Sequence, residues 1–481
     1  MQQARATVHR WRAFALLAVA FFMTVADLAI VNVALPTIGR ALHFSEANLQ
    51  WVVTAYGLTF GGFLLLGGRA ADLLGRRRIF TLGLVVFTAS SLGCALAGSE
   101  AVLIAMRGLQ GLGAAIILPA ALSIVSNMFA EGAERNKALG IWGAVGASGA
   151  TVGVLAGGLL TRYAGWEYIF FVNVPIGAVA LLLTRRLVPE SRLVHAVRRY
   201  DPFGALFVTS GLVLLVYAFS TAPDVGWQST RTIALLAVSV LLLAAFVAVE
   251  LVAESPLVPL RIFRLRMLAG ANAVGFLLGA SFFAFIFVGT LYMQQVLHYS
   301  ALQTGLAWLA TSVTSVALAG LSQALVTRTS PKLVMAGGMT LIGGGLIWMA
   351  QAPMHAHYWT NLVGALFITG VGTSFSFIPV TIGALTGVAD AEAGLASGLI
   401  NTTQQLGGAI GVAIASTVAT SHFKTLVEQG SSTGAALSGG FQWAFWACGA
   451  TALLALPAVF VIVRGRTAEE AGEAPAAKLA A

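Results

Sequence analysis

Residues 13–35 read AFALLAVAFFMTVADLAIVNVAL, an apolar stretch that contains one charged residue, Asp27. A membrane-spanning helix needs about 20 mostly apolar residues, so this stretch is long enough to cross a bilayer. It follows the basic residues Arg5, Arg10 and Arg12, but it is too long for the core of a signal peptide and lacks a clear small-residue cleavage site. We therefore expect residues 13–35 to form the first membrane span.

The composition of the whole chain supports the same interpretation. Of its 481 residues, 58% are apolar and only 9% are charged, compared with about 25% in an ordinary soluble domain. So few charges could not cover the surface of a soluble protein of this length, which excludes a cytosolic enzyme, a secreted domain and a disordered chain. Cys94 and Cys448 lie inside apolar stretches and predict no disulfide framework. The predicted fold class is an all-α polytopic membrane protein.

Long apolar runs, separated by charged residues, prolines or polar clusters, predict 14 transmembrane helices. These segments are 13–35, 51–68, 79–98, 102–125, 138–160, 167–187, 203–221, 232–250, 268–292, 304–326, 333–351, 360–386, 394–420 and 441–463. Basic loops at 188–200 and 251–266 divide them into six, two and six, which indicates two like bundles with an inserted helix pair. The predicted domains are an N-terminal six-helix bundle (1–200), the inserted pair with its basic loop (201–262), and a C-terminal six-helix bundle with a short cytoplasmic tail (263–481).

Basic residues are distributed unevenly between the predicted connections. With the N-terminus inside, 22 of the 27 Lys and Arg residues lie in inner segments, four lie in outer loops (Arg40, Arg162, Arg231 and Lys424), and Arg107 lies within a span. The positive-inside rule therefore predicts a multi-pass protein of the cytoplasmic (inner) membrane with both termini in the cytoplasm. Because the basic residues are scattered rather than gathered on one face, the net charge of +9 does not indicate a nucleic-acid partner.

Asp27 and Arg107 stand apart because both lie inside predicted spans at a similar depth. At 1.5 Å per helical residue, Asp27 lies about 13 Å and Arg107 about 9 Å from the outer ends of their helices. A carboxylate inside a membrane is costly and is by default a functional hypothesis, and a buried arginine needs a partner. We expect the two side chains to pair, either as proton-coupling residues or as a fixed structural ion pair.

Groups that support catalysis or metal binding are missing from the middle of the predicted spans. None of the seven histidines lies there, and the sequence contains no HExxH motif and no Ser-His-Asp arrangement. We therefore expect no enzyme, no metal site and no cofactor, with a proton gradient as the energy source.

Two motifs point to a known family. The connection between the second and third segments reads Gly68-Arg-Ala-Ala-Asp72-Leu-Leu-Gly75-Arg76-Arg77-Arg78, and the fourth segment contains Arg107-Gly-Leu-Gln110-Gly111-Leu-Gly113-Ala114. The connection resembles the signature loop of the major facilitator superfamily. The second stretch is similar to the fourth-helix motif of that family, whose arginine takes part in proton coupling, so the resemblance implies this role for Arg107.

The fifth segment carries a stripe of glycines that includes Gly149, Gly153, Gly157 and Gly158. It is similar to the antiporter motif of drug exporters, except that Val154 stands where the motif has proline. Glycines spaced by three or four residues form one smooth helix face. Gly57 with Gly61, and Gly407 with Gly411, repeat that spacing. Such stripes either let the two bundles slide against each other or simply allow tight packing.

Further stretches narrow the resemblance to the 14-helix drug:proton antiporters, from about residue 13 to 463. They are Asp27-Leu-Ala-Ile-Val-Asn32-Val-Ala-Leu-Pro36, Trp51-Val-Val-Thr54-Ala-Tyr56, Trp166-Glu-Tyr-Ile-Phe-Phe-Val-Asn173-Val-Pro175-Ile-Gly177, Leu291-Tyr292-Met-Gln294-Gln295 and Ala396-Ser-Gly398-Leu-Ile-Asn401-Thr-Thr-Gln404-Gln405-Leu-Gly407-Gly408. We expect an apolar substrate cavity with a few polar groups. Its predicted lining residues are Asn32, Tyr56, Gln110, Phe283, Tyr292, Asn401 and Gln404.

The predicted function is the export of lipophilic drugs or antibiotics in exchange for protons by alternating access. The C-terminal half has no second acid in the middle of a span, which favours neutral or monocationic substrates. The expected partners are the small-molecule substrate, protons and the lipid bilayer, with a monomer as the working unit. The alternatives are a dedicated exporter of an endogenous metabolite or lipid, and a membrane sensor that does not transport.

Overall fold

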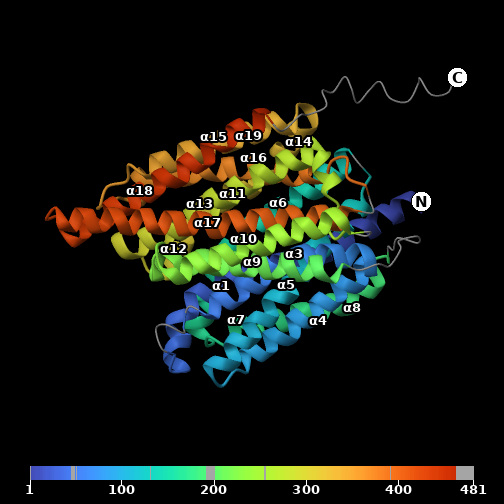
Figure 1. The fold of residues 1–481 in the computed structure, drawn as a ribbon, viewed down its shortest axis with the longest axis horizontal. Coiled ribbons are helices and arrows are strands. Elements are labelled where there is room, and N and C mark those ends of the chain that lie inside the picture. Colours follow the sequence, from blue (N-terminus) through green and yellow to red (C-terminus); the bar gives the residue numbers. More distant parts are fainter. Residues whose placement is uncertain are drawn as a thin grey trace.

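A computed structural model describes residues 2–44, 49, 51–130, 132–190, 201–253, 256–389 and 392–461 of the chain. Within these residues all regular secondary structure is helical, and no β-strand occurs. The long helices run side by side along one direction (Figure 1). A helix satisfies its own backbone hydrogen bonds, which is what a chain crossing a bilayer requires because lipid offers no partners.

The first part of the chain forms the N-terminal helices. They are α1 (Gln2–Ala41), α3 (Trp51–Leu74), α4 (Arg76–Ala95), α5 (Glu100–Met128), α6 (Ala133–Tyr163), the short α7 (Tyr168–Phe171) and α8 (Asn173–Leu187). Gly75 joins α3 to α4 with a φ of 105°, a left-handed conformation that glycine adopts at little cost. The chain can therefore turn from one helix directly into the next.

The remaining helices comprise a separate pair and the C-terminal group. The pair is α9 (Pro202–Val225) and α10 (Thr230–Val252), followed by the 3-10 helix η1 (Leu260–Arg264). The C-terminal group is α11 (Arg266–Leu291), the π-helix η2 (Tyr292–Val296), α12 (Ala301–Ala307), α13 (Leu309–Ala317), α14 (Ala319–Arg328), α15 (Pro331–Met349), the π-helix η3 (Tyr358–Leu362), α16 (Val363–Leu385), α17 (Ala393–Glu428), α18 (Thr433–Leu453) and α19 (Ala455–Val461).

Thirteen helical stretches of the described chain are long and apolar enough to cross a membrane. They correspond to the predicted segments with one exception, the fifth (138–160), which falls within α6. That helix has 31 residues and is rich in glycine. Consecutive short helices act as one span in several places, and the clearest is Leu302–Arg328, which contains α12, α13 and α14.

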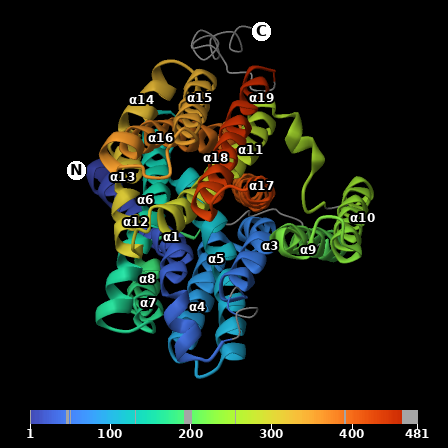
Figure 2. The ribbon, with the colours of Figure 1, turned by 90° about the vertical axis from the view of Figure 1, so that its left-hand side faces the viewer.

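The helices form two groups that pack side by side, with α9 and α10 at the edge (Figure 2). In the N-terminal group, α5 packs against α3 and α4, and α1 packs against α6. In the C-terminal group, α17 packs against α11, and α15 against α16. The two groups meet where α3 and α5 contact α17, and where α6 contacts α12, α13, α14 and α16.

The inserted pair is attached to both groups. Helix α9 packs against α3 and α17, and Trp227, in the turn after α9, donates a hydrogen bond of 2.7 Å to Thr417 of α17. At the other end of the pair, Arg69 of α3 donates to the carbonyl oxygen of Pro256. Helix α9 therefore covers the side of the seam between α3 and α17.

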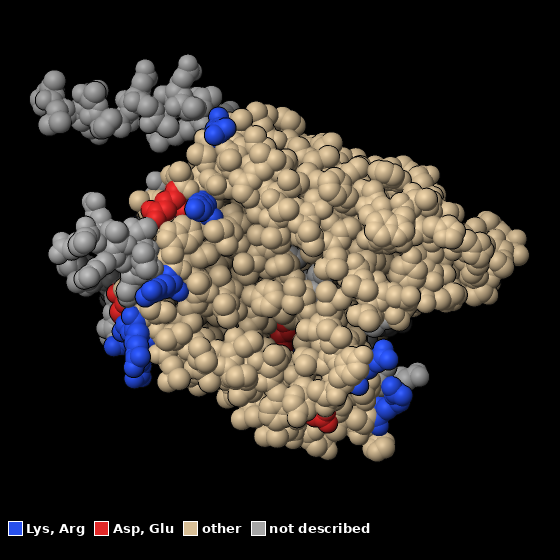
Figure 3. All heavy atoms as spheres, turned by 180° about the vertical axis from the view of Figure 1, so that it is seen from behind, with Lys and Arg blue, Asp and Glu red and all other residues tan. Residues whose placement is uncertain are grey.

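The start of α1 and the end of α19 lie at the same end of the bundle, which we call the terminal face. Arg10 of α1 and Arg135 of α6 line one cavity there, and Asn136 of α6 bonds Thr327 at the end of α14. Lys332, just beyond α14, donates to the carbonyl oxygen of Phe460 in α19. Figure 3 shows Lys and Arg at the two ends of the molecule, while its broad middle is almost free of them.

Candidate functional site

The structure brings Asp27 of α1 and Arg107 of α5 into direct contact. The Arg107 Nη1 atom lies 2.5 Å from Asp27 Oδ2, and the two side chains are completely buried. This ion pair joins two helices of the same bundle. Because each charge has lost its water, the pair depends on its mutual contact and on the hydrogen bonds around it.

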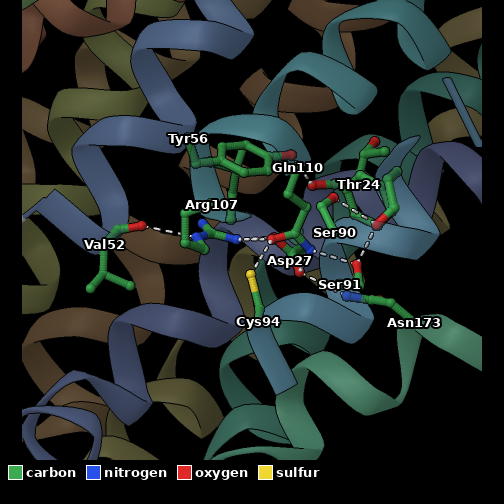
Figure 4. A network of polar contacts seen from close by, with 12 residues as sticks. Thr24, Asp27, Val52, Tyr56, Ser90, Ser91, Cys94, Arg107, Gln110 and Asn173 are labelled. Atoms are coloured by element: carbon green, nitrogen blue, oxygen red, sulfur yellow. Dashed lines mark hydrogen bonds and ion pairs between the residues drawn. The ribbon is translucent and has the colours of Figure 1, made fainter. Parts of the chain in front are cut away.

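Two amide side chains hold the second carboxylate oxygen of Asp27 (Figure 4). Gln110 Nε2 and Asn173 Nδ2 donate to Asp27 Oδ1 at 2.8 and 2.7 Å. Gln110 Nε2 also donates to Ser91 Oγ, while its oxygen accepts a 2.6 Å hydrogen bond from Arg107. Helices α1, α4, α5 and α8 therefore meet in one polar network that surrounds the carboxylate.

The Arg107 guanidinium also contacts α3. Its Nε atom donates to the carbonyl oxygen of Val52 at 2.9 Å, and its central carbon lies 4.4 Å from the centre of the Tyr56 ring. Tyr56 is itself fully buried and donates through its hydroxyl to the carbonyl oxygen of Thr24. A cation placed over an aromatic ring is attracted by the ring's electrons, more strongly where water is absent.

Glycines in α5 allow this close arrangement. A side chain at Gly111 would overlap the carbonyl oxygen of Tyr56 in α3, and a Cβ at Gly113 would lie 2.7 Å from the amide nitrogen of Phe87 in α4. Small residues let helix backbones approach closely. The motif around Arg107 thus brings α3 and α4 near enough for Val52 and Ser91 to reach the network.

A second polar cluster joins the two bundles at the terminal face. Asp72, at the end of α3, is 2% exposed and forms a 3.0 Å salt bridge with Arg76. Its two oxygens accept hydrogen bonds from the backbone amides of Gly394 and Leu395, at 3.1 and 2.9 Å, where α17 begins. A carboxylate is favourable at a helix N-terminus because the unpaired amides there carry partial positive charge. A side chain at Gly68 would overlap the carbonyl oxygen of Gly394, so the backbones of α3 and α17 also touch.

This cluster yields a prediction. Replacing Asp72 with asparagine is expected to separate α3 from α17 at the terminal face, because two hydrogen bonds to a charged group and one salt bridge are lost. Each such hydrogen bond contributes about 1.5–3 kcal/mol, enough for a shift of about tenfold or more in the balance between closed and open forms. Distances between spin labels at Leu82 in α4 and Leu333 in α15 report the change.

Asp201 provides the matched control for this measurement. It caps the start of α9 by accepting from the Gly204 amide, and it takes no part in the seam between α3 and α17. Asp201→Asn should leave the label distances unchanged. An Asp72→Asn protein with the wild-type distance distribution would show that the cluster does not hold the two bundles together.

The motif glycines of α6 face α1, whereas Gly140 and Gly143 of the same helix face Gln323 of α14 and Ile378 of α16 in the other bundle. Cβ atoms at Gly149, Gly153 and Gly157 would lie 2.9, 2.5 and 2.7 Å from atoms of Val25, Ala26 and Ile30 in α1, which belongs to the same bundle, and one at Gly158 would lie 4.0 Å from Val33. Gly407 and Gly411 similarly pack against α11, and Gly61 faces Val216 of α9. In this structure the motif glycines of α6 therefore serve packing within the N-terminal bundle, while Gly140 and Gly143 allow α6 to approach the C-terminal bundle.

The seven predicted cavity residues are not gathered at one place. Tyr56 and Gln110 belong to the buried network around Asp27. Tyr292 is fully buried against Phe441 and Phe445 in the core of the C-terminal group. The other four are partly or well exposed: Asn32 on α1, Phe283 on α11, and Asn401 and Gln404 on α17.

A cavity of about 670 Å³ opens instead at the terminal face. Its lining includes Arg10, Asn127, Phe129, Arg135 and Val388. In the part of the chain that the structure describes, no group of three or more His, Cys, Asp or Glu residues could hold a metal ion.

Several members of the network were not predicted as site residues. Asn173, Ser91 and the backbone carbonyl of Val52 contribute to it, and Asn173 touches the carboxylate directly. The sequence carried one signal for Asn173, a polar residue two positions before Pro175 inside an apolar segment. In the structure Asn173 is the first residue of α8, close after α7 ends at Phe171.

Comparisons with known proteins agree on one family. The family model described as Major Facilitator Superfamily matches residues 17–412. The puromycin resistance protein pur8 of Streptomyces alboniger is 37% identical over 474 residues, which cover 97% of this chain and 94% of that protein. The cephamycin export protein CmcT of Amycolatopsis lactamdurans is 39% identical over 411 residues, with 84% of each chain covered.

The fold is also similar to that of a solved structure. The human organic anion transporter MFSD10 (TETRAN) superposes with a TM-score of 0.66 and 16% sequence identity, and the match covers 94% of this chain and 99% of that one. This likeness concerns the fold alone. The named relatives and this neighbour are resistance, export and transport proteins and not enzymes.

Proposed function

The chain belongs to the major facilitator superfamily and is a transporter and not an enzyme, and we propose that it exports lipophilic drugs or antibiotics in exchange for protons. Relatives that match most of its length are named for puromycin resistance and for cephamycin export. These names support a small-molecule antibiotic as the class of substrate.

The observation that carries the proton-coupling part of the proposal is the buried contact between Asp27 and Arg107. As a carboxylate, Asp27 neutralises the arginine and accepts from two amides. A proton on Asp27 would cancel its charge and weaken every one of these contacts, since each hydrogen bond to a charged group is stronger than its neutral counterpart. Proton binding from outside and release inside would thus alter how α1, α4, α5 and α8 are held together.

One exchanged proton supplies enough free energy for useful export. A charge that crosses 100 mV gains about 2.3 kcal/mol, so about 150 mV provides roughly 3.5 kcal/mol. At about 1.4 kcal/mol for each tenfold step, this supports a concentration ratio of roughly 300 for a neutral substrate. A second acid in the membrane is therefore not needed.

The proposed topology has 14 spans, which are the thirteen helical stretches above and α6, the helix that covers the apolar segment predicted at 138–160. Its 31 residues extend about 46 Å at 1.5 Å per residue, more than the hydrocarbon thickness of about 30 Å. The terminal face is then cytoplasmic by the positive-inside rule, with both termini inside and the protein in the cytoplasmic membrane. The contact between Asp72 and α17 closes that side, so substrate would leave toward the opposite face.

The substrate path is proposed to run between the two bundles. Asn32, Phe283, Asn401 and Gln404, which are not fully buried, are the predicted cavity residues that remain available to a ligand. A mostly apolar surface with a few amides suits neutral or monocationic lipophilic compounds. The working unit is proposed to be a monomer, because each bundle and the seam between them are formed within one chain.

A second candidate is a dedicated exporter of one natural product. It is favoured by the names of the two relatives described above, one for puromycin resistance and one for cephamycin export. Both candidates use the same proton chemistry and differ only in how many compounds are accepted.

The experiment that tests the proposal is transport by the purified protein in liposomes. Puromycin and a cationic dye are supplied with an imposed proton gradient, and uptake is measured with and without a protonophore. Gradient-dependent uptake of both compounds supports a drug exporter, while uptake of one alone supports the dedicated exporter. If the protonophore leaves uptake unchanged, transport is not coupled to protons and the proposal fails.

A further inference from the structure

Asn173 differs from the other hydrogen-bond partners of Asp27 because its side chain can change from donor to acceptor. It is the first residue of α8, 4% exposed, and among the described residues its side chain makes one hydrogen bond, the 2.7 Å contact from Nδ2 to Asp27 Oδ1. The amide group carries a donor nitrogen and an acceptor oxygen on one carbon. A half-turn about its terminal torsion exchanges the two in space, and that torsion has a broad, roughly two-fold preference.

The other two partners cannot make this exchange. Arg107 has donors only. Gln110 is held on both sides: its nitrogen donates to Asp27 and Ser91, and its oxygen accepts from Arg107 at 2.6 Å. Turning the Gln110 amide would place its oxygen against the carboxylate and its nitrogen against the guanidinium. Asn173 is therefore the one direct partner whose reversal breaks no other hydrogen bond of the described network.

Protonation of Asp27 requires such a reversal. A carboxylate only accepts hydrogen bonds, whereas a carboxylic acid also donates one. A proton on Oδ1 would point at the nitrogen of Asn173 or Gln110, which offers no acceptor, and a buried polar group without a partner is costly. The reversed Asn173 amide presents its oxygen at the place where its nitrogen was, and so accepts the new O–H bond.

The remaining titratable neighbours do not supply this acceptor. Tyr56 of α3 directs its hydroxyl to the carbonyl oxygen of Thr24. Cys94 of α4 has its sulfur 3.8 Å from Gln110 Oε1, as a donor to that oxygen. Arg107 of α5 is the charged group that faces the carboxylate.

We propose that Asn173 is a positioning residue for proton uptake: it donates to Asp27 in the carboxylate form, accepts from Asp27 in the acid form, and directs the proton to Oδ1. The step adds one proton from a hydronium ion to Oδ1, replaces the donation from Asn173 with an O–H bond that Asn173 accepts, and weakens the donation from Gln110. The inference rests on the proposed function, since it concerns the same proton.

The test compares Asn173→Leu, which has nearly the same size but no polar atoms, with wild type in liposomes. Substrate-driven proton release is expected to fall about tenfold or more, the size of one lost hydrogen bond to a charged group. Asn272→Leu is the control, because Asn272 is similarly buried, at 5% exposure, but belongs to α11 and bonds Leu268 and Thr403. It should retain wild-type proton release.

Infrared difference spectra between high and low pH provide a second measurement. A side chain with a purely structural role would give no pH-dependent amide band. Wild type should show a carboxyl band, lost in Asp27→Asn, together with a side-chain amide band that shifts when asparagine carries a ¹³C-labelled amide carbon. This measurement uses the wild-type fold and so does not depend on the stability of Asn173→Leu. Normal proton release by Asp27→Asn overturns both the proposed function and this inference. Wild-type spectra with the carboxyl band and no asparagine band overturn the inference alone, as does normal proton release by Asn173→Leu.

Discussion

Asp27→Asn is expected to abolish proton-coupled transport. Asparagine has the same shape but cannot take up a proton at this position. Its oxygen still accepts from Arg107, which also keeps the Val52 carbonyl, Gln110 and the Tyr56 ring. Loss of a group that transfers a proton typically costs about a hundredfold or more in rate. Substrate-driven proton release, followed with a pH-sensitive dye inside liposomes, should fall by at least this factor.

Substrate exchange without a gradient should survive in the same variant. Exchange of external for internal substrate needs the protein to move between its two open forms with substrate bound, and no net proton movement is required. Glu250→Gln is the matched control, because Glu250 is a buried acid at the end of α10 that accepts from the amides of Leu257 and Val258, away from Asp27. Proton release at the wild-type rate in Asp27→Asn would show that another group carries the proton.

The sequence was sufficient to predict the arrangement along the membrane normal. Apolar runs follow the hydrocarbon thickness, and a helix rises by a fixed 1.5 Å per residue. Depth could therefore be computed for Asp27 and Arg107 in different segments, and the structure brings these two side chains together. The same reasoning predicts a span at 138–160, and one continuous helix, α6, covers that segment in the structure.

The sequence was not sufficient to predict which neighbour each helix face meets. Spacing places Gly149, Gly153 and Gly157 on one face, but it leaves open whether that face meets the other bundle or packs within its own; the observed partner is α1. Tyr56 in α3 and Gln110 in α5 lie on helices that also carry exposed side chains, yet both side chains point toward Arg107. Asn173 was missed because its contact with Asp27 joins residues 146 positions apart in the chain. Such contacts depend on helix packing angles, which one sequence does not specify.

Arg107→Leu is expected to destabilise the protein strongly. The substitution leaves the Asp27 carboxylate buried with only two neutral amide donors. Removing one partner of a buried ion pair costs about 3–5 kcal/mol, because the remaining charge has neither water nor its partner. The free energy of unfolding, measured for the purified protein in micelles, should fall by this amount. Arg78→Leu is the control: its side chain is 66% exposed, it lies 3.8 Å from Glu190, and a surface pair of this kind contributes about 0–1 kcal/mol.

The combination Asp27→Asn with Arg107→Leu should recover much of that loss. With the carboxylate removed, the leucine leaves no uncompensated charge, and replacement of a whole buried pair by groups of similar volume is often close to neutral. The four proteins form a double-mutant cycle that isolates the interaction between the two side chains. A double variant whose loss equals the sum of the two single losses would mean that Asp27 and Arg107 do not stabilise each other. The ion pair would then have to be separated in the state that dominates in solution, so the same cycle also reports which conformation the free protein prefers.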